Sequence, residues 1–248
     1  MPPRIFDEPC RWRVEAASAL RLTDDELVAV LSPGAAFPAV LESMVRAFPA
    51  RAAVLVDIGA GGGGASEWLR VATGAAVIAV EPEAGARRTA RECFPRLAVV
   101  DGSAADTGLP DHAADIITLC GVWSLLDEVG PVLDEIGRLI APGGIVAVTD
   151  LFAHRHRLVS APNVFRTLEE TVTLLTDRGW EVSELGCGTP AVSSPWAPTA
   201  ELVDSWIEQH CSGREGYGEW LADRDHLGAH IDHGDVLAGS VVATVAVG

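Results

Sequence analysis

Lysine is absent from this sequence of 248 residues, and all eighteen basic residues are arginine. Without a lysine amine the chain cannot form a Schiff base with a carbonyl substrate or with pyridoxal phosphate. It also lacks the lysine with which a P-loop holds nucleotide phosphates. These two kinds of site are therefore excluded.

Cysteines and long apolar runs are also scarce. The five cysteines are odd in number and scattered, and none forms a Cys-x-x-Cys pair, so the pattern predicts neither a disulfide framework nor a zinc ribbon. No run of eighteen apolar residues is present, and the first residues lack the apolar core of a signal peptide. We therefore expect a soluble, cytoplasmic protein with no membrane partner.

Positive charge is in deficit, because the formal net charge is −17 at pH 7. Over most of such a surface the phosphates of a nucleic acid would be repelled, and no run of arginines indicates a basic groove. We expect a small-molecule substrate and no nucleic acid. A homodimer is compatible with this composition.

The first fifty residues have helical patterns, and the chain then alternates strand and helix. Thr23 to Glu26 is a capping box whose helix is stopped by Ser32-Pro33-Gly34, and an amphipathic helix is expected over 37–48. Further helices are expected over 65–71 and 84–93 and from Pro131. Five short apolar strands are expected, ending at Asp57, Glu81, Asp101, Cys120 and Asp150. Such regular alternation predicts a parallel sheet with helices on both faces.

After residue 150 the pattern changes. A helix capped at Thr167 and stopped at Gly179 precedes a strand near 180–185, and two helical segments follow around 202–207 and 217–221. An apolar strand over 241–247 closes the chain. We therefore expect a helical cap (1–50), a core (51–187), a helical insert or lid (188–238) and a final core strand (239–248).

The most informative stretch is Gly59-Ala60-Gly61-Gly62-Gly63-Gly64, directly after an apolar strand. It fits the dinucleotide pattern G-x-G-x-x-G and also, counted from Asp57, the pattern D-x-G-x-G-x-G. Glu81, which closes the next strand, suits both ligand types because both present ribose hydroxyls. Asp57 favours the second pattern, since a carboxylate there suits a ligand with a cationic amine.

At four places in order the chain resembles the class I S-adenosylmethionine-dependent methyltransferases, over roughly residues 54–150. The matching segments are Val56-Asp57-Ile58-Gly59-Ala60-Gly61-Gly62-Gly63, Val80-Glu81-Pro82, Ala114-Asp115-Ile116-Ile117-Thr118 and Ile136-Gly137-Arg138-Leu139-Ile140-Ala141-Pro142-Gly143-Gly144. The resemblance implies an α/β fold with a seven-stranded, mostly parallel, doubly wound sheet and an antiparallel last strand. It also implies S-adenosyl-L-methionine as cofactor and S-adenosyl-L-homocysteine as product.

The resemblance also assigns cofactor contacts. The methionine portion would lie against Asp57, Gly59, Ala60, Gly61 and Gly63, and the ribose against Glu81 and Pro82. Many relatives have Gly-Asp-Ala after the third strand, where this chain has Gly102-Ser103-Ala104 preceded by Asp101. Either Asp101 or Ser103, next to Gly102, would therefore contact the adenine. Cys120, at the end of the fourth strand, is expected to abut the cofactor.

The acceptor side carries weaker signals. Methyl transfer needs a positioned nucleophile, and a base only if the acceptor must lose a proton. The segment Gly121 to Leu126 lacks the His pair that many relatives carry there. His154 and His156 are candidate bases, with solvated loop residues as the alternative. Trp12, Trp123, Ser124 and His154 are expected to contact the acceptor, with ordinary core packing as the alternative for the tryptophans.

His226 and His230 lie one helical turn apart, a spacing that can chelate a metal. Gly228 and Gly234 weaken the helix, and acids are interleaved with the histidines as on an exposed face. We therefore expect no metal site, and substrate contacts from this lid region instead.

The resulting prediction is an S-adenosylmethionine-dependent methyltransferase acting on an oxygen, nitrogen or carbon nucleophile of a small molecule, such as a secondary metabolite. A cyclisation or rearrangement catalysed on the same fold is an alternative, and so is a non-catalytic S-adenosylmethionine-binding partner protein. An NAD-dependent oxidoreductase is disfavoured by Asp57 and by the expected reversed last strand.

Overall fold

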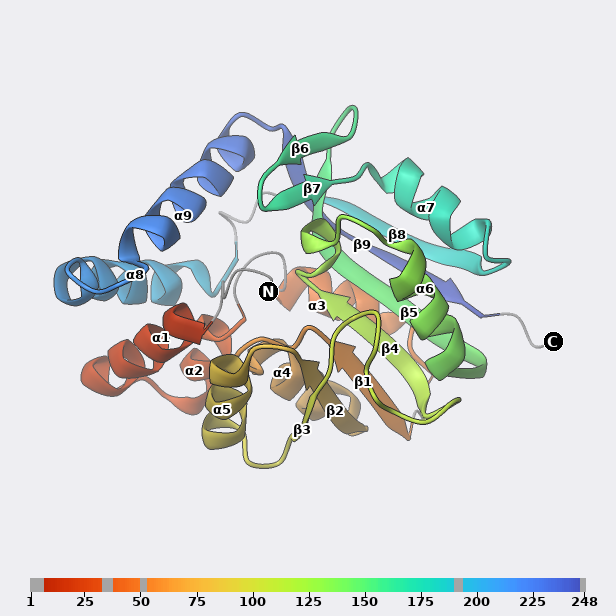
Figure 1. The fold of residues 1–248 in the computed structure, drawn as a ribbon, viewed down its shortest axis with the longest axis horizontal. Coiled ribbons are helices and arrows are strands. Elements are labelled where there is room, and N and C mark those ends of the chain that lie inside the picture. The colour runs from red at the N-terminus through yellow and green to blue at the C-terminus, as the bar shows by residue number, and fades with distance from the viewer. Residues whose placement is uncertain (1–6, 33–37, 50–52, 190–193, 246–248) are drawn as a thin grey trace.

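A seven-stranded sheet forms the centre of the computed structural model, which describes residues 7–32, 38–49, 53–189 and 194–245 (Figure 1). Its strand order is β3-β2-β1-β4-β5-β9-β8. All neighbouring pairs are parallel except those made by β9, which runs antiparallel to β5 and β8. The predicted fold class is therefore confirmed. The strands are β1 (Val54–Ile58), β2 (Ala76–Glu81), β3 (Ala98–Asp101), β4 (Ala114–Cys120), β5 (Ile140–Ala153), β8 (Glu181–Thr189) and β9 (Val236–Thr244).

Helices cover both faces of this sheet because successive strand residues point to opposite faces. Leu55 and Ile116 belong to one buried cluster, together with side chains of α3, α4 and α8. Val56 and Ile117 belong to a second cluster, on the side of α6 and α7. The helices of the core are α4 (Gly64–Thr73), α5 (Ala84–Cys93), α6 (Gly130–Leu139) and α7 (Leu168–Thr176).

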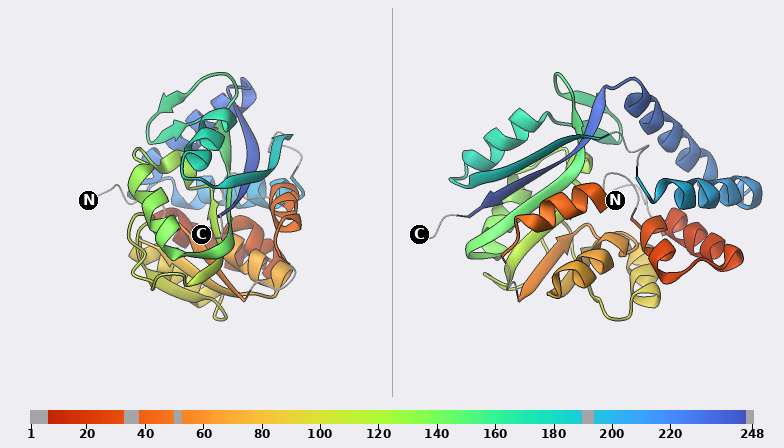
Figure 2. Two further views of the ribbon diagram at one scale, coloured as in Figure 1. Left: turned by 90° about the vertical axis from the view of Figure 1, so that its right-hand side faces the viewer. Right: turned by 180° about the vertical axis from the view of Figure 1, so that it is seen from behind.

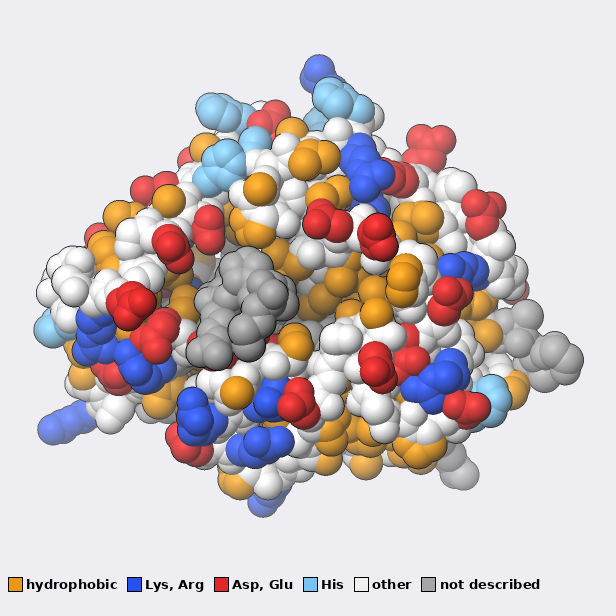
Figure 3. All heavy atoms as spheres, viewed as in Figure 1, with side chains coloured by type: hydrophobic (Ala, Val, Ile, Leu, Met, Phe, Trp, Pro, Cys, Tyr) orange, Lys and Arg blue, Asp and Glu red, His pale blue; other side chains and the backbone are white. Residues whose placement is uncertain are grey.

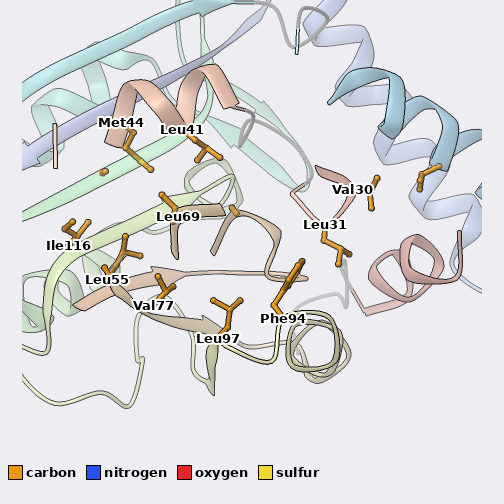
Figure 4. Packing of buried hydrophobic residues seen from close by; sticks show 14 of the residues in the cluster. Val30, Leu31, Leu41, Met44, Leu55, Leu69, Val77, Phe94, Leu97 and Ile116 are labelled. Carbon is orange, nitrogen blue, oxygen red and sulfur yellow. The ribbon is translucent and has the colours of Figure 1, made fainter. Parts of the chain in front are cut away.

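Figure 4 shows the first cluster from close by, with Leu41 and Met44 of α3 and Leu69 of α4 above the strand residues Leu55 and Ile116. All five side chains are fully buried. Truncating one such side chain to Ala typically costs about 2–5 kcal/mol of stability, so this layer holds the strands that present the glycine stretch.

The described part of the N-terminal segment contains three helices, α1 (Asp7–Leu20), α2 (Asp24–Val30) and α3 (Pro38–Arg46). The capping box at Thr23 and Glu26 is confirmed, since both reciprocal hydrogen bonds are present. α1 packs against α5 and α8, and α2 packs against α4. The predicted stop at Pro33-Gly34 and the predicted helix start at Phe37 lie outside the described residues.

The insert is helical as predicted, with α8 (Ala197–Cys211) and α9 (Tyr217–Asp232). The right-hand view of Figure 2 places these helices beside α1 and at the edge of the sheet rather than over its centre. Residues 188–238, predicted as an insert, overlap β9, which begins at Val236. The division of the chain into cap, core and lid stays a prediction.

The strand bounds around Asp150 differ from the prediction. β5 was expected over 145–149 and instead extends from Ile140 to Ala153, because β9 pairs with it as far as Ala153 opposite Val236. The predicted turn at Pro142-Gly143-Gly144 is present as an irregularity inside β5, where Gly143 has φ +77°. β9 likewise begins at Val236 rather than at 241, and residues 246–247 lie outside the described ranges.

A short hairpin, β6 (Leu158–Ser160) and β7 (Asn163–Phe165), follows β5 and was not predicted. Its three-residue strands are too short to show alternation. Within the described ranges, no helix has the length and apolar character that crossing a bilayer requires.

Candidate functional site

The glycine stretch leaves β1 in a turn whose backbone is open on one side. Gly59 and Gly61 have φ of +75° and +54°, a region that residues with a Cβ rarely adopt. A Cβ on Gly59 would lie 2.4 Å from Cγ2 of Val122, whereas a Cβ on Gly61 would meet no atom of the described residues within 4 Å. The turn therefore packs tightly against the loop after β4 and leaves space at Gly61 for a ligand to approach the main chain.

The other side of the same turn is covered by the N-terminal helices. A Cβ on Gly62 would lie 2.9 Å from Leu31 and 3.3 Å from the sulfur of Cys10. The N–H of Gly64 donates to the carbonyl of Leu31 at 3.2 Å. Burial raises the pKa of the Cys10 thiol to about 12, so Cys10 is a neutral packing residue.

Glu81 ends β2 with a carboxylate held beside this turn. Oε2 accepts from the N–H of Gly61 at 2.8 Å, and Oε1 accepts from the N–H of Glu83 at 2.8 Å. The side chain is 3% exposed, and burial raises its pKa, while the two N–H groups favour the charged form. A positioned carboxylate next to an open glycine turn is the arrangement that binds ribose hydroxyls.

Asp57 is buried beneath the turn. Oδ1 accepts from the Thr118 hydroxyl at 2.7 Å, and Oδ2 accepts from the Ser66 hydroxyl, so the carboxyl group joins β1 to β4 and to α4. Burial raises the pKa of Asp57 to about 6. A contact between Asp57 and a ligand amine stays a prediction. Ser66 and Thr118 were missed by sequence reasoning, because a hydroxyl in a helix or a buried strand gives no local signal.

The residues predicted for the adenine end lie at the end of β3. Asp101 is exposed and forms an ion pair with Arg87 at 2.9 Å. Ser103 forms a tight turn, with its N–H donating to the carbonyl of Asp106 at 2.8 Å. Arg87 also donates to the carbonyl of Pro82 at 2.6 Å, so this arginine ties the ends of β2 and β3 together. The choice between Asp101 and Ser103, beside Gly102, stays open.

Cys120 ends β4 and is half-buried. Burial, reinforced by the nearby negative charge of Asp57, raises the pKa of its thiol well above the usual range. The thiol therefore stays protonated, which suits a residue that packs beside a ligand and not a nucleophile.

The loop after β4 is held at several points. The Trp123 indole N–H donates to the Thr171 hydroxyl at 3.0 Å, and the N–H of Ser124 donates to the Asp150 carboxylate at 2.9 Å. The Ser124 hydroxyl accepts from the side-chain amide of Asn163 at 3.1 Å. Burial raises the pKa of Asp150 to about 6. Trp123 is fully buried, so a role in acceptor binding stays a prediction.

Arg166 also holds the loop after β4. Sequence reasoning missed it, because a lone arginine is normally predicted to lie on the surface. Its guanidinium is buried and donates to the carbonyls of Trp123 at 3.1 Å, Leu126 at 2.6 Å and Asp127 at 3.0 Å. It also lies over the Trp123 ring, 5.6 Å from the centroid. The loop is therefore preorganised at the carboxyl edge of the sheet.

Of the other predicted acceptor residues, His154 and His156 follow β5 and are exposed. The backbone N–H of His154 donates to the carbonyl of Asp235 at 2.9 Å. Trp12 is fully buried and packs against Tyr217 and Trp220, with ring centroids 6.4 and 6.2 Å away. The role of His154 and His156 as bases stays a prediction, and so does the contact of Trp12 and His154 with the acceptor.

Histidines gather where α9 meets the β6–β7 hairpin, visible at the upper edge of Figure 3. The Ser160 hydroxyl contacts Nε2 of both His226 and His230, the latter at 3.0 Å, and Nδ1 of His230 lies 3.0 Å from the Asp235 carboxylate. The spacing of Ser160, His230 and Asp235 resembles a hydrolase triad, but the second imidazole also occupies the hydroxyl. Within the described ranges, no three potential metal ligands are grouped to hold an ion.

Apolar side chains pack together where this hairpin, α9 and the ends of β5 and β9 meet. Phe165, Leu151 and Val236 are buried there, with Leu227 and Ile231 of α9 packed against them. In the view of Figure 3, hydrophobic side chains also line a hollow near the centre of the molecule.

Sequence comparison finds that residues 56–148 match a family model described as a methyltransferase domain. This segment runs from β1 into β5 and contains the glycine turn and Glu81. Among curated proteins, none matches the sequence closely enough to count as a relative.

Solved structures share the fold at low identity. Phosphoethanolamine N-methyltransferase 2 of Haemonchus contortus, in complex with phosphomonomethylethanolamine and S-adenosylhomocysteine, superposes with a TM-score of 0.63 and 17% identity. The match covers 84% of this chain and 52% of that one, so this chain spans about half the length of that protein.

Two other structures match over more of their own length. A proposed sarcosine dimethylglycine methyltransferase from Galdieria sulphuraria has a TM-score of 0.62 and 16% identity, over 95% of this chain and 86% of that one. The cyclase SpnF has a TM-score of 0.62 and 18% identity, over 85% and 80%. At such identities the likeness shows a shared fold and not a shared substrate.

Proposed function

We propose that this chain, whose residues 56–148 match a methyltransferase domain family, transfers a methyl group from S-adenosyl-L-methionine to an oxygen, nitrogen or carbon nucleophile of a small molecule. The observation that carries the proposal is the Glu81 carboxylate, held by the N–H of Gly61 beside the open glycine turn. This arrangement places a carboxylate that can accept hydrogen bonds from ribose hydroxyls next to a main chain that a ligand can approach closely.

The residues present fit this cofactor. Space above Gly61 would admit the methionine portion, and Glu81 would bind the ribose hydroxyls. Asp101 or Ser103 would contact the adenine. Cys120, kept as a neutral thiol by burial, would pack beside the ligand. When bound, the cofactor supplies a methyl group on a cationic sulfur that leaves as a neutral thioether.

The protein's own contribution is positioning and exclusion of water. The loop after β4 is fixed by Asp150, Asn163 and Arg166, so its backbone need not reorganise during the reaction. The apolar wall formed by α9 and the hairpin would keep water from the acceptor. If the acceptor carries a proton, His154 or His156 is the proposed base.

Calorimetry with S-adenosylmethionine, S-adenosylhomocysteine and NAD tests the cofactor. We expect micromolar binding of the first two. Glu81→Ala should weaken binding roughly 10- to 100-fold, because ligand hydroxyls would lose their buried partner. Glu92→Ala, which removes an exposed acid at the end of α5, is the matched control and should bind normally.

Binding of NAD without the other two ligands would contradict the proposal. Incubation with methyl-labelled S-adenosylmethionine and a panel of phenols, amines and carbon acids then tests transfer. Label should appear in an acceptor in equal amount to the S-adenosylhomocysteine formed. A consumed acceptor without label would indicate a reaction other than methylation.

A further inference from the structure

The first helix of the chain begins against the loop that follows Glu81. Oδ1 of Asp7 accepts from the N–H groups of Gly85 at 2.7 Å and Ala86 at 3.1 Å, the second and third residues of α5. The N–H of Asp7 donates to the Glu83 carboxylate at 2.9 Å. Asp7 therefore supplies a cap for α5 from a position 78 residues earlier in the chain.

The fit at this contact is close. A Cβ on Gly85 would lie 2.6 Å from Cγ and Oδ1 of Asp7, so only glycine admits the carboxylate here. Glu83 links this cap to the ribose acid, because its backbone N–H donates to Glu81 while its side chain accepts from Asp7. Asp7 and Glu81 are thus fixed to the same short loop.

The same helix also contacts the glycine turn and the lid. Cys10 lies against Gly62, one turn after Asp7. Trp12 packs against Tyr217 and Trp220, which belong to α9. Glu15 forms an ion pair with Arg214 at 2.6 Å, just after α8. Figure 1 shows α1 between α5 on one side and α8 on the other.

We propose that Asp7 is a positioning residue for the cofactor site, and that α1 transmits cofactor binding to the lid helices α8 and α9. The proposal rests on the proposed function, since it takes Glu81 as the ribose-binding acid. A ligand held by Glu81 stabilises the loop that Asp7 caps. Because α1 also contacts α9 and the residues after α8, those helices become less mobile as well. Because such coupling is reciprocal, loss of the Asp7 cap weakens cofactor binding.

The first test compares affinities for S-adenosylhomocysteine by calorimetry. Asp7→Ala should bind about 10-fold more weakly, and Asp7→Asn within about threefold of the wild type, because its amide oxygen still accepts both N–H bonds. Gly85→Ala displaces Asp7 while improving the helix propensity of α5, so its affinity should fall without a matching fall in melting temperature.

Thr23→Ala is the control for a general loss of stability, because it removes the cap of α2 away from the ribose loop. It should lower the melting temperature and leave affinity unchanged. Wild-type affinity in both Asp7→Ala and Gly85→Ala would overturn the positioning role. An equal loss in Thr23→Ala would overturn it too, by assigning the effect to stability alone.

Amide exchange over 197–232 tests the coupling. Saturating S-adenosylhomocysteine should slow exchange there in the wild type, and this slowing should be lost in Asp7→Ala at its own saturating concentration. Equal slowing in both proteins would overturn the coupling. If the wild type does not bind S-adenosylhomocysteine, the proposed function fails; if it binds and Asp7→Ala behaves alike, only this inference fails.

Discussion

At the scale of single residues, burial decides what the carboxyl group of Asp57 can do. The group lies between two hydroxyl donors, and loss of water raises its pKa to about 6, from an ordinary value of 3.8. A carboxyl group whose pKa is raised by folding favours the folded state most when protonated. Its stabilising contribution is complete below pH 3.8 and is lost as the pH rises through 6.

Asp57→Asn should therefore become more stable relative to the wild type as the pH rises from 4 to 7. The relative gain should be roughly 2 kcal/mol, since each pKa unit corresponds to about 1.4 kcal/mol and the unfolded chain is already partly ionised at pH 4. Urea unfolding at several pH values measures this difference. Asp150 is present in both proteins, so its contribution to the pH dependence cancels in the difference between them. Asp134→Asn, at a side chain that is 76% exposed, should show no such trend, and a flat difference for Asp57→Asn would refute the burial argument.

The same residue marks how far the site could be predicted from sequence. Gly59 and Glu81 were identifiable because local spacing places a glycine turn and an acid at the ends of adjacent strands. The partners of Asp57 were not, because Thr118 lies 61 residues away on a strand that reaches Asp57 only after the sheet forms. Arg166 was missed for the same reason, since its carbonyl partners lie about forty residues earlier.

At the scale of elements, the loop after β4 is held in place by a residue that directly follows strand β7. Arg166, directly after β7, supplies donors to the carbonyls of Trp123, Leu126 and Asp127. Arg166→Met should leave these carbonyls without a partner and lower the free energy of unfolding by roughly 2–4 kcal/mol. Urea unfolding and proteolysis within 121–127 measure the two consequences.

Arg157→Met is the matched control for this change, because Arg157 is exposed and its ion pair with Glu170, at 3.3 Å, lies on the surface. It should change stability by less than about 0.5 kcal/mol. An Arg166→Met protein as stable and as resistant to protease as the control would show that the loop is held by its other contacts alone.

Helices whose ends are marked by capping residues could be predicted from sequence. Strands whose length depends on pairing with a distant strand could not. The helix starts at Thr23 and Thr167 follow from caps that the structure contains. The length of β5 does not follow, because its last residues are ordered by β9, some eighty residues later. The acid Asp150 looked like a strand end, yet it is buried inside β5, where it accepts from the backbone of the loop after β4.

At the scale of the whole molecule, the helices α8 and α9 are attached to different parts of the chain. One attachment runs through α1 to the ribose loop, by way of Glu15 and Arg214. The other joins α9 to the hairpin, where Ser160 contacts His226 and His230. The second attachment lies at the end of α9 away from the glycine turn, which is covered by α1 and α2.

Ser160→Ala should therefore free the end of α9 without affecting the cofactor. Losing hydrogen bonds worth about 1 kcal/mol should speed amide exchange over 226–232 by roughly fivefold. Affinity for S-adenosylhomocysteine should stay within about twofold of the wild type. Ser212→Ala, at an exposed serine after α8, is the control and should change neither quantity. Unchanged exchange in α9, or a cofactor affinity that falls with Ser160→Ala, would show that the two attachments do not act separately.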